Sequence, residues 1–304
     1  MNEEIIKTVN LVKYYDDCCA LNNVNISIKK GSVCGLIGNN GAGKSTLIKI
    51  IMGLLKPTRG ESKMFGINSF LLPDDYKNRI GYLIEGHPLY SGMTIEEISN
   101  FTKKFFRNWS DEKFGKFLSY FELDKKKKIR KLSKGQQAQV SISLVLAYSP
   151  ELLILDDPTI GLDTGLRREF LESIIHIIQK EGSTILFSTH ILNELERVAD
   201  HIIMLDKGEV FVDSPIDYLR EKVRKFSLNF NDVQNDIEKF SIIKGAIAVE
   251  TLEKYVLISI ANYNSETFDE LKKFNPVNIV EIGLSLEDIY IEYCVKRKKK
   301  ILDF

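Results

Sequence analysis

The chain has 304 residues, of which 44% are hydrophobic and 28% are charged, the balance of an ordinary globular protein with room for about two domains. Its 42 basic and 42 acidic residues cancel, so the overall charge gives no support to a nucleic-acid binder. The four cysteines lack the spacing of zinc ligands and are too few for a disulfide scaffold, so we expect reduced thiols.

The N-terminal segment does not resemble a signal peptide. Glu3 and Glu4 stand where a basic segment would be expected, and no long apolar stretch follows. The longest apolar runs, 140–147 and 152–155, fall far short of the ~18 residues that a membrane-spanning helix needs. We therefore expect a cytoplasmic chain that meets a membrane only through a partner or a surface.

Residues 1 to about 220 alternate short β-rich runs with longer helical patterns. This alternation is typical of a mostly parallel sheet with helices on its faces. Strands are expected at 5–9, 33–37, 152–155, 184–187 and 201–205, and helices at 44–55, 135–148, 166–180 and 191–198. Strand signals vanish between about 94 and 150, so that stretch is expected to be a helical insertion.

The pattern changes after about residue 224. Apolar and polar residues alternate within 226–230 and 256–260, which is the period of a strand, and the apolar residues of 286–293 follow helical spacing. We therefore predict two domains, residues 1–222 and 223–304. The second is expected to be a small α+β domain that ends in an amphipathic helix.

A glycine-rich segment follows the expected strand 33–37 and opens the next expected helix. It matches G-x-x-x-x-G-K-[ST], the phosphate loop of nucleotide-binding proteins. Glycines let successive backbone N–H groups point at an anion, and the helix start adds partial positive charge. Lys44 would reach the β- and γ-phosphates, and the Ser45 hydroxyl would hold Mg²⁺. The residues expected to bind nucleotide are Gly38, Asn39, Asn40, Gly41, Ala42, Gly43, Lys44, Ser45 and Thr46.

A pair of carboxylates follows a second apolar strand, in the run Leu-Leu-Ile-Leu-Asp-Asp-Pro at 152–158. Open α/β sheets bind their ligands at the carboxyl ends of the strands. Asp156 would organise Mg²⁺ directly or through water, and Asp157 would position or polarise the attacking water beside the γ-phosphate. Alone, the run could be a strand that leads into a turn, but the phosphate loop earlier in the chain favours a nucleotide site.

Residues 132–137, Leu-Ser-Lys-Gly-Gln-Gln, resemble the L-S-G-G-Q signature of the ATP-binding cassette (ABC) family. Tyr15 resembles the family's adenine-stacking aromatic, residues 161–163 its D-loop, and His190 its switch histidine. The resemblance covers about residues 3–215. It implies a RecA-like P-loop NTPase fold, with a mostly parallel core, an antiparallel β edge and a helical insertion. It also implies ATP and Mg²⁺ as ligands and ATP hydrolysis as the activity.

The family resemblance places part of the site on a second chain. Its signature docks on the nucleotide of the opposite subunit, so Ser133, Gly135 and Gln136 are expected to act in trans. A hydroxyl and free N–H groups at a helix start suit a γ-phosphate. His190, after a strand, is expected to hydrogen-bond the γ-phosphate and sense hydrolysis. Tyr15 could also be a plain strand-end aromatic, since a second tyrosine precedes it.

Three positions depart from the family pattern. Asp157 stands where Glu is common, a loss of about 1.5 Å of reach. Because a catalytic group misplaced by about 1 Å can cost ~100-fold in rate, we expect slow hydrolysis unless the backbone compensates. Glu85 replaces the Q-loop glutamine, and its carboxylate can still meet Mg²⁺ or water. Lys134 replaces a glycine, and either a phosphate contact or a solvent-exposed position suits it.

Further segments carry weaker signals. The basic runs 125–131 and 296–300 are expected to be solvated, the alternative being contact with anionic lipid beside a membrane partner. Residues 283–290 resemble the S-L-E-D ending common in ATPase subunits of ABC-2-type exporters, although Ser285 and Asp288 also suit a helix cap. A group of aromatics follows Glu85 and His87 in the sequence: Phe101, Phe105, Phe106 and Trp109. We expect them to form the core of the helical insertion. In the ABC family, this region forms the groove that receives a coupling helix of the transmembrane subunit.

The favoured interpretation is the ATP-binding and ATP-hydrolysing subunit of an ABC exporter. It would pair with a second ATP-binding subunit, identical or related, and with a transmembrane permease at the inner face of the cell membrane. One alternative is a soluble ABC ATPase without a permease, although a single cassette without heptad insertions is unlike the translation and repair types. The other is a nucleotide-gated dimerisation switch whose hydrolysis is weakened by Asp157.

Overall fold

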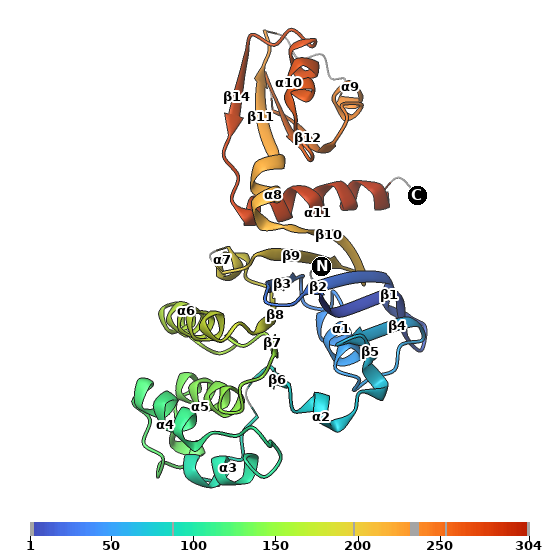
Figure 1. Ribbon diagram of the computed structural model, residues 1–304. Helices are drawn as coiled ribbons and strands as arrows, with labels where there is room; N and C mark the ends of the chain where they lie inside the picture. Colours follow the sequence, from blue (N-terminus) through green and yellow to red (C-terminus); the bar gives the residue numbers. More distant parts are fainter. Residues whose placement is uncertain (1–2, 87, 197, 232–236, 253, 303–304) are drawn as a thin grey trace. The chain divides into compact units, whose positions relative to one another are not determined.

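The computed structural model describes residues 3–86, 88–196, 198–231, 237–252 and 254–302. The chain divides into two compact units, residues 1–213 and 214–304, and each is described by itself (Figure 1). The sequence placed the domain boundary after residue 222, and the structure places it before the helix α8 (Ile216–Lys222).

The first unit is built on a six-stranded sheet with the order β10-β9-β3-β8-β7-β6. From β9 to β6 all neighbouring strands are parallel, which confirms the predicted parallel core. Every residue of β3, β7 and β8 is buried, as expected for parallel strands covered on both faces. The strands are β3 (Val33–Ile37), β6 (Ile80–Leu83), β7 (Leu152–Asp156), β8 (Thr184–Thr189), β9 (His201–Asp206) and β10 (Glu209–Pro215).

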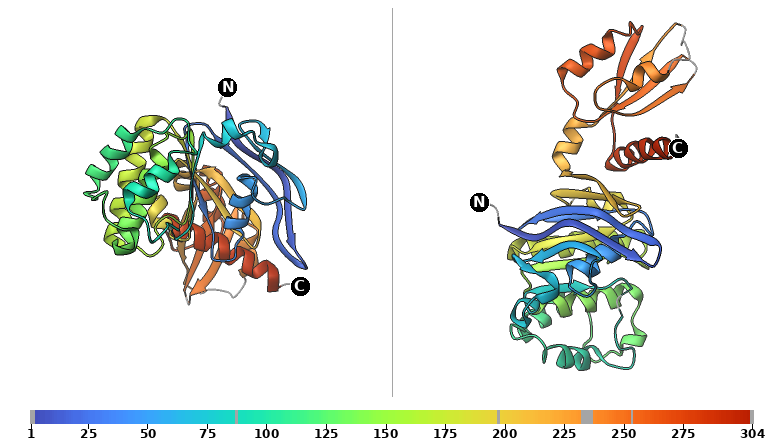
Figure 2. Two further views of the ribbon diagram at one scale, coloured as in Figure 1. Left: turned by 90° about the horizontal axis from the view of Figure 1, so that it is seen from below. Right: turned by 90° about the vertical axis from the view of Figure 1, so that its right-hand side faces the viewer.

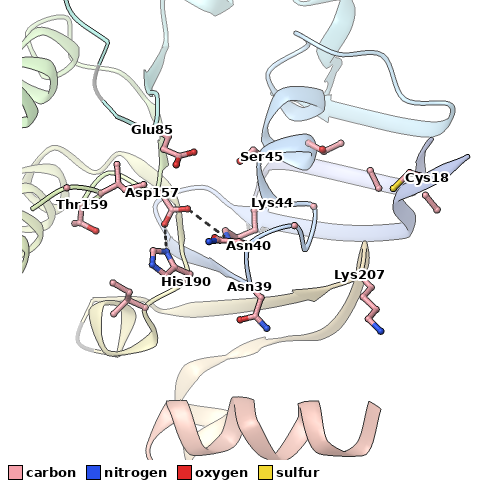
Figure 3. A pocket seen from close by; sticks show the side chains of 18 of the residues that line it. Cys18, Asn39, Asn40, Lys44, Ser45, Glu85, Asp157, Thr159, His190 and Lys207 are labelled. Atoms are coloured by element: carbon pink, nitrogen blue, oxygen red, sulfur yellow. Dashed lines mark hydrogen bonds and ion pairs between the residues drawn. The ribbon is translucent and has the colours of Figure 1, made fainter. Parts of the chain in front are cut away.

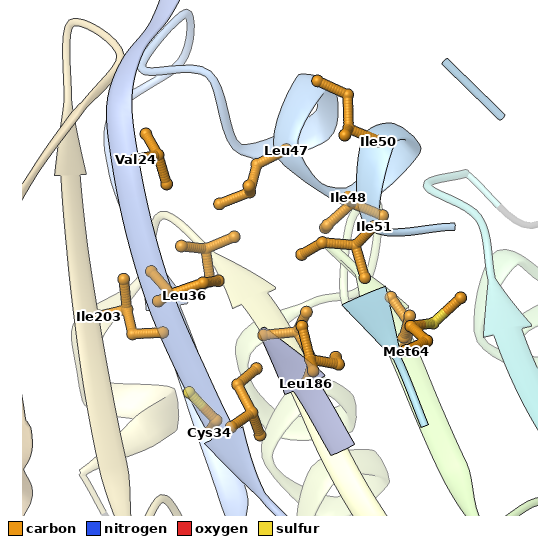
Figure 4. Close-up of a cluster of buried hydrophobic side chains, with 14 of the residues drawn as sticks. Val24, Cys34, Leu36, Leu47, Ile48, Ile50, Ile51, Met64, Leu186 and Ile203 are labelled. Carbon is orange, nitrogen blue, oxygen red and sulfur yellow. The ribbon is translucent and has the colours of Figure 1, made fainter. Parts of the chain in front are cut away.

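A second, antiparallel sheet has the order β2-β1-β4-β5. Only part of its first strand was predicted from the sequence, yet β1 and β2 each run for 12 residues. The reason is the core beneath them: α1 (Lys44–Ile51) lies between the two sheets, and its apolar side chains pack with Val24, Leu36 and Leu186 (Figure 4). The strands are β1 (Glu4–Tyr15), β2 (Cys18–Lys29), β4 (Arg59–Met64) and β5 (Ile67–Asn68).

Helix α1 ends earlier than its apolar period predicts. The pattern continues to Leu55, but Gly53 adopts a left-handed φ of 69°, which terminates helices. A Cβ at Gly53 would lie 2.2 Å from the Ser69 carbonyl oxygen, so glycine is required where these segments touch. The short helices η1 (Ser69–Leu71) and α2 (Asp74–Lys77) follow.

The expected helical insertion at 94–150 is helical in the structure. Its helices cluster around a small core of their own, and Figure 2 shows them on the opposite side of the parallel sheet from the antiparallel strands. Its elements are α3 (Ile95–Thr102), α4 (Asp111–Tyr120), η2 (Ile129–Lys131) and α5 (Lys134–Leu146); α6 (Thr164–Glu181) and α7 (Leu192–Leu195) complete this unit.

The expected aromatic core of that insertion is only partly correct. Phe106 stacks on Tyr148 with ring centroids 3.8 Å apart, and Trp109 packs against Phe114. Phe101 and Phe105 are instead exposed. Phe101 lies on α3 outside its buried stripe, which includes Ile95 and Ile98, and Phe105 follows the end of that helix. His87 lies outside the described residues.

The second unit is a four-stranded antiparallel sheet with the order β12-β13-β11-β14. Phe226, Leu228 and Ile258 face a common core, which confirms the predicted alternation. Ser285 and Asp288 cap the last helix, since each accepts a hydrogen bond from the other's backbone N–H. The elements are α8 (Ile216–Lys222), β11 (Arg224–Asn229), α9 (Ile237–Ser241), β12 (Ala246–Leu252), β13 (Tyr255–Ile260), α10 (Ser265–Lys272), β14 (Asn278–Ile282) and α11 (Leu286–Leu302).

None of the helices in the described part of the chain combines the length and the apolar character needed to cross a membrane. The basic run 296–300 belongs to α11, and its side chains fall outside those described.

Candidate functional site

The glycine-rich loop joins the end of β3 to the start of α1 and depends on its glycines. Gly41 and Gly43 have φ values of 82° and 109°, which favour residues without a side chain. A Cβ at Gly43 would lie 2.7 Å from the Ala20 carbonyl oxygen, and one at Gly38 would lie 2.5 Å from the Leu205 carbonyl oxygen. The loop is therefore fitted tightly between β2 and β9, with its backbone turned toward one cavity.

Lys44 begins α1 and is only 6% exposed. Its Nζ donates a hydrogen bond of 2.8 Å to the Gly38 carbonyl oxygen and lies 3.9 Å from Oδ2 of Asp157. A buried ammonium is costly without such partners. The fold thus holds one positive charge at the mouth of the loop, facing the end of β7.

Asp156 ends β7 and is 3% exposed. Burial raises the pKa of its carboxyl, an effect partly offset by hydrogen bonds from Ser188 and Ser45. The Ser188 hydroxyl donates to Oδ1 of Asp156 at 2.7 Å. Carboxylate and hydroxyl oxygens are the ligands that Mg²⁺ prefers, so Asp156 and Ser45 form a suitable pair.

Asp157 is held in an unusual backbone conformation. Its φ is 42°, a left-handed value that costs on the order of 1 kcal/mol for a residue with a Cβ. Two atoms of Ser188, the carbonyl oxygen and Oγ, accept from the Asp157 N–H. Oδ1 of Asp157 lies 3.1 Å from Nδ1 of His190 (Figure 3). This geometry turns the carboxylate away from the sheet and toward Lys44 and His190.

These groups surround a cavity of about 790 Å³. It brings together most residues predicted from the motifs: Asn39, Asn40, Gly41, Gly43, Lys44, Ser45, Thr46, Glu85, Asp157 and His190. Gly38, Ala42 and Asp156 lie just behind this lining, where they shape the loop and hold Ser45.

Several lining residues were not predicted. Residues Cys18, Cys19, Ala20, Thr159, Ile160, Arg167, Ile191 and Lys207 also line the cavity. Some of them had a signal in the sequence, because Thr159, Ile160 and Ile191 directly follow recognised motif residues. Lys207 had none, since it comes from the hairpin between β9 and β10.

Tyr15 does not line this cavity. Its side chain is 46% exposed, and Lys13 Nζ lies 5.2 Å from its ring centroid. In the β1–β2 ladder Tyr15 pairs with Cys18, and the cavity wall is formed there by Cys18, Cys19 and Ala20.

The signature segment lies outside the cavity of its own chain. Ser133 is the N-cap of α5 and forms a capping box with Gln136: the Ser133 Oγ accepts from the Gln136 N–H at 3.1 Å, and Gln136 Oε1 accepts from the Ser133 N–H at 3.2 Å. Ser133 and Lys134 are exposed, and Gly135 is half-buried. The start of α5 therefore presents a hydroxyl and a helix N-terminus to whatever approaches it.

The residues fit a nucleoside triphosphate with Mg²⁺. The loop would lose its shape if a Cβ were added at Gly38 or Gly43, and the oxygen ligands are of the kind that Mg²⁺ prefers. Within the described residues no cluster of three His, Cys, Asp or Glu side chains could hold a metal by itself. Mg²⁺ sites in nucleotide-binding proteins can use one or two carboxylates and otherwise phosphate oxygens and water.

Comparison with known proteins points in the same direction. Residues 21–160 match the model of the ABC transporter family. The bacitracin transport ATP-binding protein BcrA of Bacillus licheniformis is 35% identical over 226 residues, 73% of this chain and 73% of BcrA. The lantibiotic transport ATP-binding protein SrtF of Streptococcus pyogenes is 37% identical over 216 residues, 70% of this chain and 92% of SrtF.

Solved structures extend the likeness to three dimensions. An ATP-binding subunit of an ABC transporter superposes with a TM-score of 0.63 at 29% identity, over 71% of this chain and 92% of that one. The ATP-binding cassette MJ0796, solved as a dimer in a post-hydrolysis state with ADP and phosphate, gives a TM-score of 0.61 at 30% identity, over 69% and 98%. The chain therefore belongs to the ABC transporter family, as an ATP-binding and ATP-hydrolysing subunit.

Proposed function

We propose that this chain powers a membrane exporter by closing and reopening a dimer of ATP-binding subunits around ATP. In the closed state ATP lies between the phosphate loop of one subunit and the signature segment of the other, contributed by Ser133, Gly135 and Gln136. Two observations support this arrangement: the signature segment does not line the cavity of its own chain, and a similar cassette has been solved as a dimer.

Within one subunit, each side chain has a role that follows from its chemistry. Backbone N–H groups of 38–46 and the ammonium of Lys44 bind the phosphates. Ser45 and Asp156, with Glu85 nearby, would hold Mg²⁺, which neutralises phosphate charge when bound. Asp157 positions the attacking water. His190 hydrogen-bonds the γ-phosphate and changes partner once that phosphate leaves.

One observation carries this assignment. The Asp157 carboxylate reaches two other motif residues at once, His190 at 3.1 Å and Lys44 at 3.9 Å, on the wall of a single cavity (Figure 3). These three residues come from three different motifs far apart in the sequence. A carboxylate held between a cation and an imidazole is fixed in place and can accept a hydrogen bond from an attacking water, which orients that water. Tyr15 does not line the cavity, whereas Cys18 and Ala20 do. Its proposed place beside adenine therefore rests only on its position at the end of β1, where it pairs with Cys18.

The permease is proposed to dock on a separate groove. A cavity of about 270 Å³ is lined by apolar side chains of the segment after β6 and of α3 and α5, among them Leu89, Tyr90 and Phe101. Tyr90 and Phe101 are exposed, and their rings contact edge to face at 5.8 Å. Exposed aromatics gathered at a groove are typical of protein contact sites. This placement puts the subunit at the cytoplasmic periphery of the membrane.

ATPase assays on the purified chain with Mg²⁺ test the assignment. We expect Lys44→Ala and His190→Ala each to lower turnover by about 100-fold or more, because each removes a group that contacts phosphate. Ser133→Arg should lower turnover through the partner subunit and leave ATP binding by the single chain unchanged. If both phosphate-site variants keep normal turnover, the role assignment is wrong.

A second measurement tests the closure of the dimer independently of turnover at the nucleotide site. ATP added to an Asp157→Asn variant should produce a stable dimer, detected by size-exclusion chromatography with light scattering. A chain that binds ATP but remains monomeric under these conditions contradicts the proposed closure.

A further inference from the structure

A buried carboxylate lies close to the nucleotide cavity without lining it. Glu194 belongs to the short helix α7, and its side chain is 7% exposed. A carboxylate removed from water is unfavourable unless hydrogen bonds and an opposite charge compensate. The identity of its partners therefore shows which segments this residue holds.

Each oxygen of the Glu194 carboxylate accepts a hydrogen bond from a different segment. Thr159 Oγ1 donates to Oε1 at 3.0 Å, and Thr189 Oγ1 donates to Oε2 at 2.9 Å. Thr159 lies two residues after Asp157, and Thr189 lies directly before His190. One carboxylate thus connects the segment after β7 with the end of β8.

Arg167 brings a third segment to the same group. Its Nε lies 3.5 Å from Oε1 of Glu194, and its terminal nitrogen donates to the Leu162 carbonyl oxygen at 3.0 Å. Residue 162 belongs to the loop 161–163, which resembles the D-loop. Arg167 and Thr159 both line the nucleotide cavity, whereas Glu194 is not among the described residues that do.

The hydrogen bonds of Glu194 fix the segments that carry Asp157 and His190, the two residues that meet in the cavity. Asp157 has a left-handed φ, and such a conformation persists only where the surrounding structure holds it. Ile191 N–H also donates to Thr189 Oγ1, at 3.0 Å, which fixes the backbone on the far side of His190. The 3.1 Å contact between Asp157 and His190 depends on the placement of both segments.

We propose that Glu194 is a positioning residue for ATP hydrolysis. Its carboxylate holds Thr159, Thr189 and Arg167 in one arrangement, and this arrangement places Asp157 against His190. The inference rests on the roles proposed above for Asp157 and His190. Because Glu194 acts through its hydroxyl partners and not by contact with ATP, its loss should lower turnover more than nucleotide affinity.

Glu194→Gln tests this in the full chain. The amide keeps the size of the side chain, but its NH₂ group cannot accept the second threonine hydrogen bond, and the charge that faces Arg167 is lost. We expect kcat to fall by about tenfold or more, while the Kd for ATP, measured with Mg²⁺ chelated, stays within about twofold. The matched control is Glu172→Gln on α6, an exposed residue whose carboxylate pairs with Arg168 at 2.9 Å, and it should keep normal kcat and Kd.

Two substitutions at Thr159 separate a hydroxyl effect from a packing effect. Thr159→Ser keeps the donor and should retain about half of the kcat or more, whereas Thr159→Val keeps the shape and should fall as far as Glu194→Gln. The double variant Thr159→Val with Glu194→Gln should fall little further than either single variant, because residues that act as a unit are not additive.

The outcomes are distinguishable. Normal kcat in Glu194→Gln, or a parallel loss of kcat, ATP affinity and melting temperature, overturns the positioning role. If Lys44→Ala and His190→Ala abolish turnover in the same assay while Glu194→Gln does not, only this inference fails. If none of the three variants affects turnover, the proposed function fails with it.

Discussion

The two units use buried charge in different ways. In the first unit Lys44, Asp156 and Asp157 are each less than a tenth exposed and gather at the carboxyl ends of the parallel strands, around an open cavity. In the second unit Lys225 and Glu292 meet in an ion pair whose side chains are 17% and 7% exposed. The comparison teaches that charges which converge on a cavity serve a ligand, whereas a closed pair serves the fold.

The largest expected effect is the loss of Lys44. We expect Lys44→Ala to lower turnover by about 1000-fold, because a desolvated ammonium beside the phosphates stabilises the charge of the transition state. Lys49→Ala is the control, an exposed lysine on the same helix, and it should keep normal turnover. Thermal melting should be similar in both variants. If Lys44→Ala hydrolyses ATP normally, the buried charge of the first unit does not serve a ligand, and the contrast drawn between the two units is wrong.

Breaking the ion pair of the second unit should change stability and not nucleotide binding. Glu292→Ala leaves the Lys225 ammonium with little solvent and without the carboxylate that pairs with it, a loss of about 3 kcal/mol in unfolding free energy. Hydrogen exchange of the β11 and β13 amides in the full chain measures this unit directly. Glu287→Ala, at an exposed position on the same helix, is the control. Unchanged exchange in Glu292→Ala would show that the pair contributes nothing to the fold.

A smaller effect is expected at Asp157, where the family commonly has glutamate. Asp157→Glu keeps a carboxylate at the end of β7, so turnover should change by less than about tenfold in either direction. The measurement is kcat with saturating ATP and Mg²⁺. A rise of about 100-fold or more would instead favour the nucleotide-gated switch, in which the native aspartate weakens hydrolysis.

The smallest expected effect concerns a surface ion pair of the first unit. Arg79 Nε and one terminal nitrogen donate to both oxygens of Glu151, at 2.6 and 2.7 Å, and this hydrogen bonding lowers the pKa of Glu151. The pair should therefore stabilise the fold above the unfolded pKa of about 4.5, with the contribution lost as pH falls through the lower folded value. Because both groups are partly exposed, Glu151→Gln should cost less than about 1 kcal/mol near pH 7.

Urea unfolding at several pH values checks this prediction. The difference between the native protein and Glu151→Gln should shrink as the pH is lowered. A difference that grows in acid would contradict the direction of the pKa shift. Arg79→Lys keeps the positive charge but loses the paired hydrogen bonds. Its unfolding free energy should therefore lie between those of the native protein and Glu151→Gln.

Much of the fold could be predicted because its signals are local. The strands β3, β7 and β8 are apolar throughout, since both faces of a parallel sheet are covered. β2 was not predicted, because two adjacent exposed residues, Asn22 and Asn23, interrupt the alternation of its buried and exposed positions. Its pairing with β1 joins the two halves across this interruption. α1 was predicted too long, because the left-handed Gly53 that ends it is required by contact with Ser69.

The chemistry of the site is written in short segments of the sequence. The glycine spacing before Lys44 and the carboxylate pair after an apolar strand predict a triphosphate site. Each motif could be recognised because the groups that bind phosphate or metal within it are neighbours in the sequence. Tertiary structure alone decided which distant residues share the cavity: it brought Cys18 and Lys207 into the wall, moved Tyr15 out of it, and joined Thr159 and Thr189 through Glu194. Such contacts join residues far apart in the chain, and only the packing of the sheets and helices brings them together.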